Sequence, residues 1–196
     1  EELAAEISKT DEKDVCHSIA SAIDFANSRI YEMSLSNPAQ AGMGTTLVVA
    51  YVKDEQLWIA NIGDSRAYVV NSKEICKMTI DHSIVEELVR RGTITREEAR
   101  NHPDKNIITR ALGTEEFVDA DYYDYKLSDG ETVLLCSDGL TETVRDERIQ
   151  EIIINETDIE KAVEALVDEA NKNGTEVIIA AAGMAAALPG VVASQT

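Results

Sequence analysis

The chain has 196 residues, of which 44% are hydrophobic, and this length and composition suit a single globular domain with a core of its own. With 37 acidic and 18 basic residues the net charge is −19, which argues against binding to nucleic acid or to an anionic membrane and favours cations. Three well-separated cysteines without a CxxC pair, no secretory signal and no long apolar run argue against a disulfide frame and predict a cytoplasmic protein.

The first half of the chain changes its hydrophobic period twice. Residues 12–34 are expected to form an amphipathic helix, because apolar side chains recur every three or four positions. After a loop at 37–44, short β-branched and aromatic runs separated by polar turns are typical of an antiparallel meander. Residues 81–101 return to a helical pattern, in which Thr95 and Glu98 are placed to form a capping box.

The second half is expected to add a β-hairpin and a long helix. The hairpin turns at Asp129-Gly130, and the helix begins with a capping box of Thr157 and Glu160 and ends at Asn173. Helices before and after several antiparallel strands predict an α+β fold, in which a sandwich of antiparallel β-sheets is flanked by helices. We expect one domain over residues up to 174, because no repeat or linker divides them.

Two of the expected strands end in an aspartate beside a glycine. Asp138 follows the apolar run TVLLC, and Asp64 follows the run WIANI. Magnesium and manganese prefer carboxylate oxygens, commonly one or two together with several waters, and a carboxylate at a strand end is rigidly held. Aspartate and glycine are also common turn residues, so their spacing alone leaves both a structural and a metal-binding interpretation open.

Four longer segments carry a family resemblance, and they follow one another in the order GMGTTLVVAYV at 42–52, IGDSRAYVV at 62–70, the segment at 81–113 that opens with DHSIVEELV, and LLCSDGLTETVRDERI at 134–149. Together they resemble the bacterial type 2C, metal-dependent protein serine/threonine phosphatases. The resemblance extends over residues 1–174.

This resemblance implies both a fold and a chemistry. It implies two antiparallel sheets around a manganese or magnesium centre, where a metal-activated water hydrolyses phosphoserine and phosphothreonine in a protein substrate of a serine/threonine kinase. By the same resemblance Asp138 is a ligand of a core metal and Asp64 of an accessory metal. Residues 81–112 correspond to a flap segment beside the active site.

The chain departs from the family pattern at both ends. Members of the family begin with strands that carry a phosphate-binding arginine and further core metal ligands, and this sequence opens with what resembles the following helix. Glu176 stands where the family has another aspartate ligand. We therefore expect a sandwich that is incomplete at the N-terminus, no identifiable catalytic residue beyond the metal ligands, and impaired activity. The alternative is a non-catalytic pseudophosphatase or a chimeric binding module.

The end of the chain resembles a second family. Residues 176–194, EVIIAAAGMAAALPGVVAS, are similar to the phosphate-loop region of phosphoribosylaminoimidazole carboxylases. In that family a strand, a glycine-rich turn and a helix N-terminus hold the phosphate of a nucleotide. We expect residues 175–196 to form a carboxylase-like tail packed on the domain at 1–174, and a nucleotide-phosphate binder is a third interpretation of function.

Overall fold

The computed structural model describes residues 12–174. The predictions for the tail at 175–196, with Glu176, lie outside the described residues. The helices are α2 (Glu12–Ser36), the short 3-10 helix η1 (Pro38–Gln40), α3 (Ile84–Arg90), α4 (Arg96–Arg100), α5 (Asp138–Thr141), α6 (Asp146–Asn155) and α7 (Ile159–Lys172). The strands are β1 (Leu47–Lys53), β2 (Gln56–Ile62), β3 (Arg66–Val70), β4 (Ile75–Lys77), β5 (Asp121–Lys126) and β6 (Thr132–Cys136).

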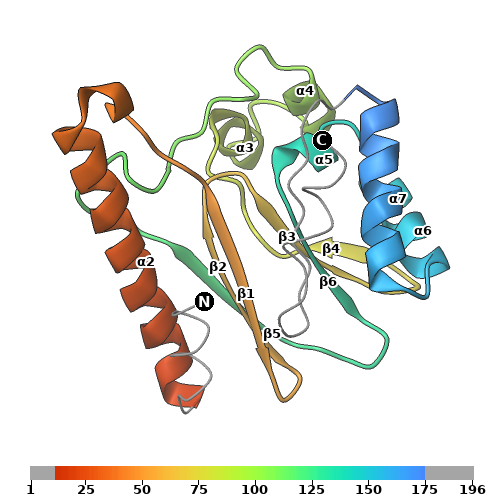
Figure 1. The fold of residues 1–196 in the computed structure, drawn as a ribbon. Coiled ribbons are helices and arrows are strands. Elements are labelled where there is room, and N and C mark those ends of the chain that lie inside the picture. The colour runs from red at the N-terminus through yellow and green to blue at the C-terminus, as the bar shows by residue number, and fades with distance from the viewer. Residues whose placement is uncertain (1–11, 175–196) are drawn as a thin grey trace.

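The described strands form two antiparallel three-stranded sheets, with the orders β1-β2-β5 and β4-β3-β6. Helix α2 covers the outer side of the first sheet, and α6 and α7 lie on the outer side of the second (Figure 1). The predicted α+β sandwich flanked by helices is therefore confirmed. No helix in the described part of the chain has the length and hydropathy needed to cross a membrane.

Alternation along β2 builds two layers of the core at once. Leu57 and Ile59 point toward the second sheet and pack with residues of β3, whereas Trp58 packs with residues of α2. This is the period of two expected for a strand that is covered on both faces. The turn from β1 to β2 is tight, because Asp54 and Glu55 both have positive φ (48° and 68°), as a two-residue hairpin of this kind requires.

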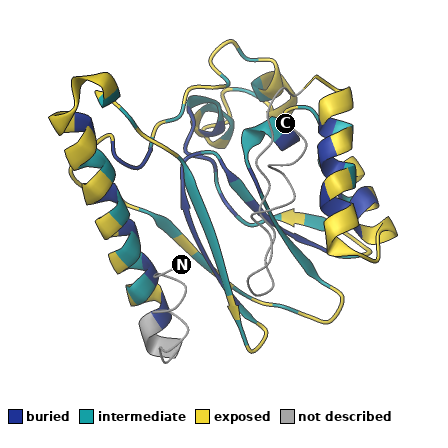
Figure 2. Ribbon diagram, viewed as in Figure 1, coloured by how far each residue is buried: buried dark blue, intermediate teal, exposed yellow. Residues whose placement is uncertain are grey.

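Helix α2 has the amphipathic character that the sequence predicted. Val15, Ile19 and Ile23 repeat at intervals of four residues and are at most 4% exposed. Figure 2 shows the buried stripe of the helix turned toward the sheet and the exposed residues turned to solvent. This stripe attaches α2 to the β1-β2-β5 sheet.

Helix α7 closes the other side, although its start differs from the prediction. The N-cap is Asp158, whose side chain accepts a hydrogen bond from the Glu160 N–H, so the predicted capping box of Thr157 and Glu160 does not form. A carboxylate one residue nearer to the helix takes the capping role, which aspartate fills as well as threonine. The capping box of Thr95 and Glu98 at α4 is present as predicted.

Candidate active site

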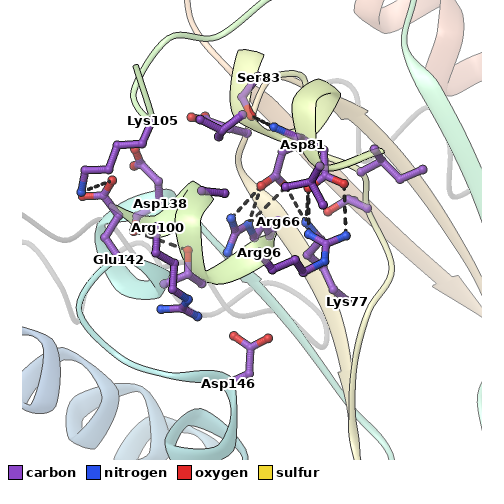
Figure 3. A pocket seen from close by; sticks show the side chains of 18 residues that line it. Arg66, Lys77, Asp81, Ser83, Arg96, Arg100, Lys105, Asp138, Glu142 and Asp146 are labelled. Carbon is purple, nitrogen blue, oxygen red and sulfur yellow. Dashed lines mark hydrogen bonds and ion pairs between the residues drawn. The ribbon is translucent and has the colours of Figure 1, made fainter. Parts of the chain in front are cut away.

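Asp64 and Asp138 come from different strands but reach the same end of one sheet. Asp138 is the first residue of α5 and follows β6, and Asp64 lies in the turn between β2 and β3. Strands β3 and β6 pair so that Arg66 is opposite Cys136, which brings the two aspartates to one edge. Both line a cavity of about 410 Å³ (Figure 3).

The turn that carries Asp64 is fixed by close packing and by a histidine. Gly63 has φ +99°, and a Cβ atom there would lie 2.3 Å from Thr46 Cγ2, so the position accepts only glycine without a rearrangement. The Gly63 N–H donates to His82 Nδ1 at 3.0 Å, and the His82 N–H donates to the Gly63 carbonyl at 2.9 Å. This reciprocal pair holds the turn from both sides.

The other nitrogen of the His82 ring faces a second charged group. His82 Nε2 lies 3.2 Å from Asp121 Oδ2, and Arg110 Nη1 donates to Asp121 Oδ1 at 2.9 Å. Burial would raise the pKa of the Asp121 carboxyl, but the hydrogen bonds from His82 and Arg110 lower it overall. His82 thus joins the turn of Asp64 to the start of β5.

The two ends of the segment at 81–112 lie side by side, and the segment between them contains α3 and α4. His82 and Thr109 are joined by a backbone hydrogen bond of 2.8 Å, and the Ile84 N–H donates to the Ile107 carbonyl at 3.1 Å. Helices α3 and α4 then lie over the same end of the sandwich as α5 (Figure 1). Several of their residues line the cavity, so this segment forms one of its walls.

A buried ion pair anchors that wall to β3. The Arg66 guanidinium binds Asp81 with two nitrogens, at 2.6 Å from Nη2 and 3.0 Å from Nε to Oδ2, and Lys77 Nζ lies 3.0 Å from Oδ1. The Asp81 side chain is only 6% exposed. Burial alone would lower the pKa of Arg66, but the hydrogen bonds and charge of Asp81 raise it overall, so the guanidinium keeps its charge.

Comparison with known proteins shows which family has this arrangement. The family model for protein phosphatase 2C matches residues 1–91. The solved structure of the serine/threonine phosphatase Stp1 from Staphylococcus aureus is 37% identical, with a TM-score of 0.82, and the match covers 89% of this chain and 70% of Stp1. The chain belongs to the protein phosphatase 2C family. Its resemblance to the bacterial members, predicted from four motifs, is confirmed.

Other relatives belong to the same family and are longer than the part of them that this chain matches. The serine/threonine phosphatase stp of Listeria monocytogenes (strain F2365) is 41% identical over 154 residues, which is 79% of this chain and 61% of that protein. The catalytic domain of the serine/threonine phosphatase PstP, solved with two manganese ions, is 30% identical with a TM-score of 0.79, over 89% of this chain and 73% of that one. This phosphatase 2C chain thus spans less than two thirds of the curated relatives it matches first.

A second family model, for AIR carboxylase, matches residues 148–196. It supports the predicted resemblance of the tail and begins earlier than the resemblance at 176–194. The match includes most of α6 and all of α7, which here pack on the phosphatase 2C sandwich through residues such as Ile149 and Leu166. The helical part of the second match is therefore part of the phosphatase 2C core in this structure.

The chemistry of the two aspartates suits a hard cation. Neither Asp64 nor Asp138 forms an ion pair within residues 12–174, although both line the cavity. Burial raises the pKa of the Asp64 carboxyl, and the negative charge of Asp138 raises it further. Two carboxylates that repel each other beside a cavity of this size fit one hydrated magnesium or manganese ion. That Asp64 and Asp138 are metal ligands stays a prediction.

Some residues of the site were not predicted from the sequence. Arg66 and Asp81 were not singled out, although the arginine stands two positions after Asp64. Asp146, at the start of α6, also lines the cavity, and its Oδ1 is buried without a hydrogen-bond partner among the described residues. Asp146 is therefore one of four further carboxylates that share the cavity with the two that were predicted, together with Asp81, Glu86 and Glu142.

Replacing Asp64 with asparagine is expected to stabilise the protein when metal is removed. A carboxyl whose pKa is raised on folding binds its proton more tightly in the folded state, so folding is favoured as the pH falls through that pKa and is penalised above it. Thermal unfolding in EDTA at pH 7 should give a higher Tm for Asp64→Asn than for the unmodified chain. The gain should shrink as the pH falls through the raised pKa of Asp64 toward the ordinary aspartate pKa of 3.8.

The control for this comparison is Asp129→Asn, which removes one negative charge from an exposed turn. It should leave the Tm nearly unchanged at pH 7 and at lower pH, because an exposed carboxylate interacts mainly with water. An Asp64→Asn protein with the same or a lower Tm than the unmodified chain in EDTA would show that the carboxylate is not under electrostatic strain.

Proposed function

We propose that this chain acts in the hydrolysis of phosphoserine and phosphothreonine in protein substrates of a serine/threonine kinase, with manganese or magnesium as cofactor. The observation that supports this most directly is the convergence of Asp64 and Asp138 on one cavity in a phosphatase 2C fold. Relatives named serine/threonine phosphatases, at about two fifths identity, support the same reaction class.

Some of the described residues would bind the metal, and others keep the wall of the cavity in place. Asp138 at the start of α5 and Asp64 on its fixed turn would hold the metal, which when bound lowers the pKa of a water and neutralises phosphate charge. Arg66 and Asp81 keep the wall at 81–112 in place, and this wall limits the access of bulk water and of substrate. No described residue is needed as a covalent nucleophile.

Turnover by this chain alone is proposed to be slow. Within residues 12–174 no group of three or more histidine, cysteine or acidic side chains is arranged to hold a metal ion. Two carboxylates fit one hydrated ion, whereas a binuclear centre requires more ligands. We therefore expect impaired activity with a remaining dependence on metal.

Single-turnover hydrolysis of a phosphothreonine peptide, with protein in excess so that slow chemistry is measurable, tests this proposal. Release of phosphate should require manganese and should fall by about tenfold or more in Asp138→Asn, which corresponds to ~1.4 kcal/mol of transition-state stabilisation. Asp168→Asn, on the exposed side of α7, is the matched control and should retain the rate. A rate that ignores manganese, or that survives in Asp138→Asn, would contradict the proposed role of this aspartate.

Two other functions have a specific observation in their favour. The absence of a three-ligand cluster among the described residues favours a pseudophosphatase or chimeric module that binds phosphoproteins without turnover. Binding of the phosphothreonine peptide without any hydrolysis would indicate this function. The AIR carboxylase match at 148–196 favours nucleotide-phosphate binding by the tail, which binding of aminoimidazole ribonucleotide would indicate.

A further inference from the structure

The cavity brings five basic side chains together with six acidic ones. The chain has 18 basic residues and a net charge of −19, yet five of those 18 are among the residues that line this one cavity. They come from β3, β4, α4 and the segment after α4. Figure 3 shows Arg66 and Lys77 at Asp81, and Lys105 at Glu142. A basic side chain in such a cavity attracts an anionic group of a ligand only where no carboxylate of the protein already pairs with it.

Four of these five cations are already neutralised by carboxylates of the protein. The pairs are Arg66–Asp81 at 2.6 Å, Lys77–Asp81 at 3.0 Å, Arg96–Glu86 at 2.9 Å and Lys105–Glu142 at 3.1 Å. Arg100 is the exception, because its side chain forms no ion pair or hydrogen bond with any residue in the described part of the chain. Its charge is therefore the one that remains available to a ligand.

The position of Arg100 is set by its backbone rather than by its side chain. It is the last residue of α4, whose first turn is fixed by the capping box of Thr95 and Glu98. The side chain is exposed, so the core does not depend on it. A basic residue at a helix C-terminus does favour the helix dipole, but a helix of five residues gains little from it. Folding alone thus gives a weak reason for an arginine that lines this cavity.

We propose that Arg100 is a specificity-determining residue, which favours phosphorylated substrates with an acidic side chain close to the phosphorylated residue. This inference rests on the proposed phosphatase function. With the phosphate directed to Asp64 and Asp138, a neighbouring residue of the peptide lies along the wall formed by α4, since all three side chains line the same cavity. A guanidinium recognises a carboxylate by paired N–H···O bonds, and a lysine in that place would be repelled.

The test compares two phosphothreonine peptides that differ only in their flanking residues, glutamate in one and lysine in the other. Manganese-dependent single-turnover rates are measured for the unmodified chain, for Arg100→Glu and for Arg90→Glu. Arg90 is the matched control, because it is an exposed arginine at the end of the neighbouring helix α3 and does not line the cavity. The ratio of the two rates in one protein cancels any change in folding or in metal content.

The unmodified chain should prefer the glutamate-flanked peptide by about fivefold, as expected for one partly exposed charge pair. The preference should disappear or reverse in Arg100→Glu, persist in Arg90→Glu, and weaken in ~1 M salt because charges on the surface are then screened. An unchanged ratio in Arg100→Glu, with both peptides still hydrolysed, would overturn this inference and leave the proposed function intact. The lack of manganese-dependent hydrolysis of either peptide would overturn both.

Discussion

Replacing Gly113 with alanine is expected to lower the free energy of unfolding by about 4 kcal/mol, since backbone strain and overpacking each cost ~2 kcal/mol. Gly113 has φ +81°, and a Cβ atom there would lie 2.1 Å from Ile30 Cγ2 and 2.7 Å from Ile30 Cβ. The crowded neighbour is a β-branched side chain on α2, which has little freedom to move. The substitution therefore strains the backbone and pushes the helix away.

The same position holds α2 by hydrogen bonds. The Gly113 N–H donates to Asn27 Oδ1 at 2.7 Å, and the Asn27 amide donates to the carbonyls of Glu115 and Glu116, both at 3.1 Å. Asn27 is 2% exposed, so these bonds replace water that the buried amide cannot reach. If α2 were displaced, the three hydrogen bonds of Asn27 would be lost together, which adds to the expected loss of stability in Gly113→Ala.

Gly130→Ala is the matched control for this prediction. Gly130 also has positive φ (+83°), but no atom lies within 4 Å of the Cβ that alanine would add. It should cost only about 1 kcal/mol, the penalty of the left-handed backbone conformation. Urea unfolding monitored by the fluorescence of the single tryptophan, Trp58, measures both variants. Equal losses in the two variants would show that the contact with Ile30 has no energetic weight.

Local patterns in the sequence predicted most of the elements, although not α5 or α6, and did not predict which strands pair. The hairpin expected to turn at Asp129-Gly130 does not form, because β5 and β6 belong to different sheets. The period of α2 and the alternation in β2 are visible in any short window, because each depends on residues two to four positions apart. The pairing of β2 with β5 and of β3 with β6 joins segments about 65 residues apart. Many alternative pairings satisfy the same alternation, and only the packed core selects among them.

The candidate site was predictable to a similar extent. Asp64 and Asp138 each stand out as an acid at the end of a strand, and the family resemblance suggested that they act together. The contact between Asn27 and Gly113 could not be predicted, because it joins residues 86 positions apart through one amide. Arg100 is also inconspicuous in the sequence, since its significance depends on the four neighbouring cations being paired and on its being left unpaired.

Replacing Asp81 with asparagine is expected to destabilise the protein by about 3 kcal/mol, which is typical for breaking one side of a buried ion pair. The asparagine side chain has one oxygen and no charge, so it cannot bind both nitrogens of Arg66 and also Lys77 as Asp81 does. Two cations would then lie beside a neutral group that is almost removed from solvent. The penalty comes from leaving them without a counter-charge rather than from the loss of one bond.

An ion pair on the surface serves as the control, because it differs from Arg66–Asp81 mainly in its exposure to solvent. Glu97 and Arg145 lie 3.9 Å apart with side chains 68% and 69% exposed, so Glu97→Gln should change stability by less than about 0.5 kcal/mol. Denaturant unfolding in low salt and in ~1 M salt should show a loss in Asp81→Asn that persists, because a buried pair is screened far less than an exposed one. If Asp81→Asn were as mild as Glu97→Gln, the wall at 81–112 would be held mainly by its backbone bonds, from His82 to Gly63 and between Leu112 and Thr45.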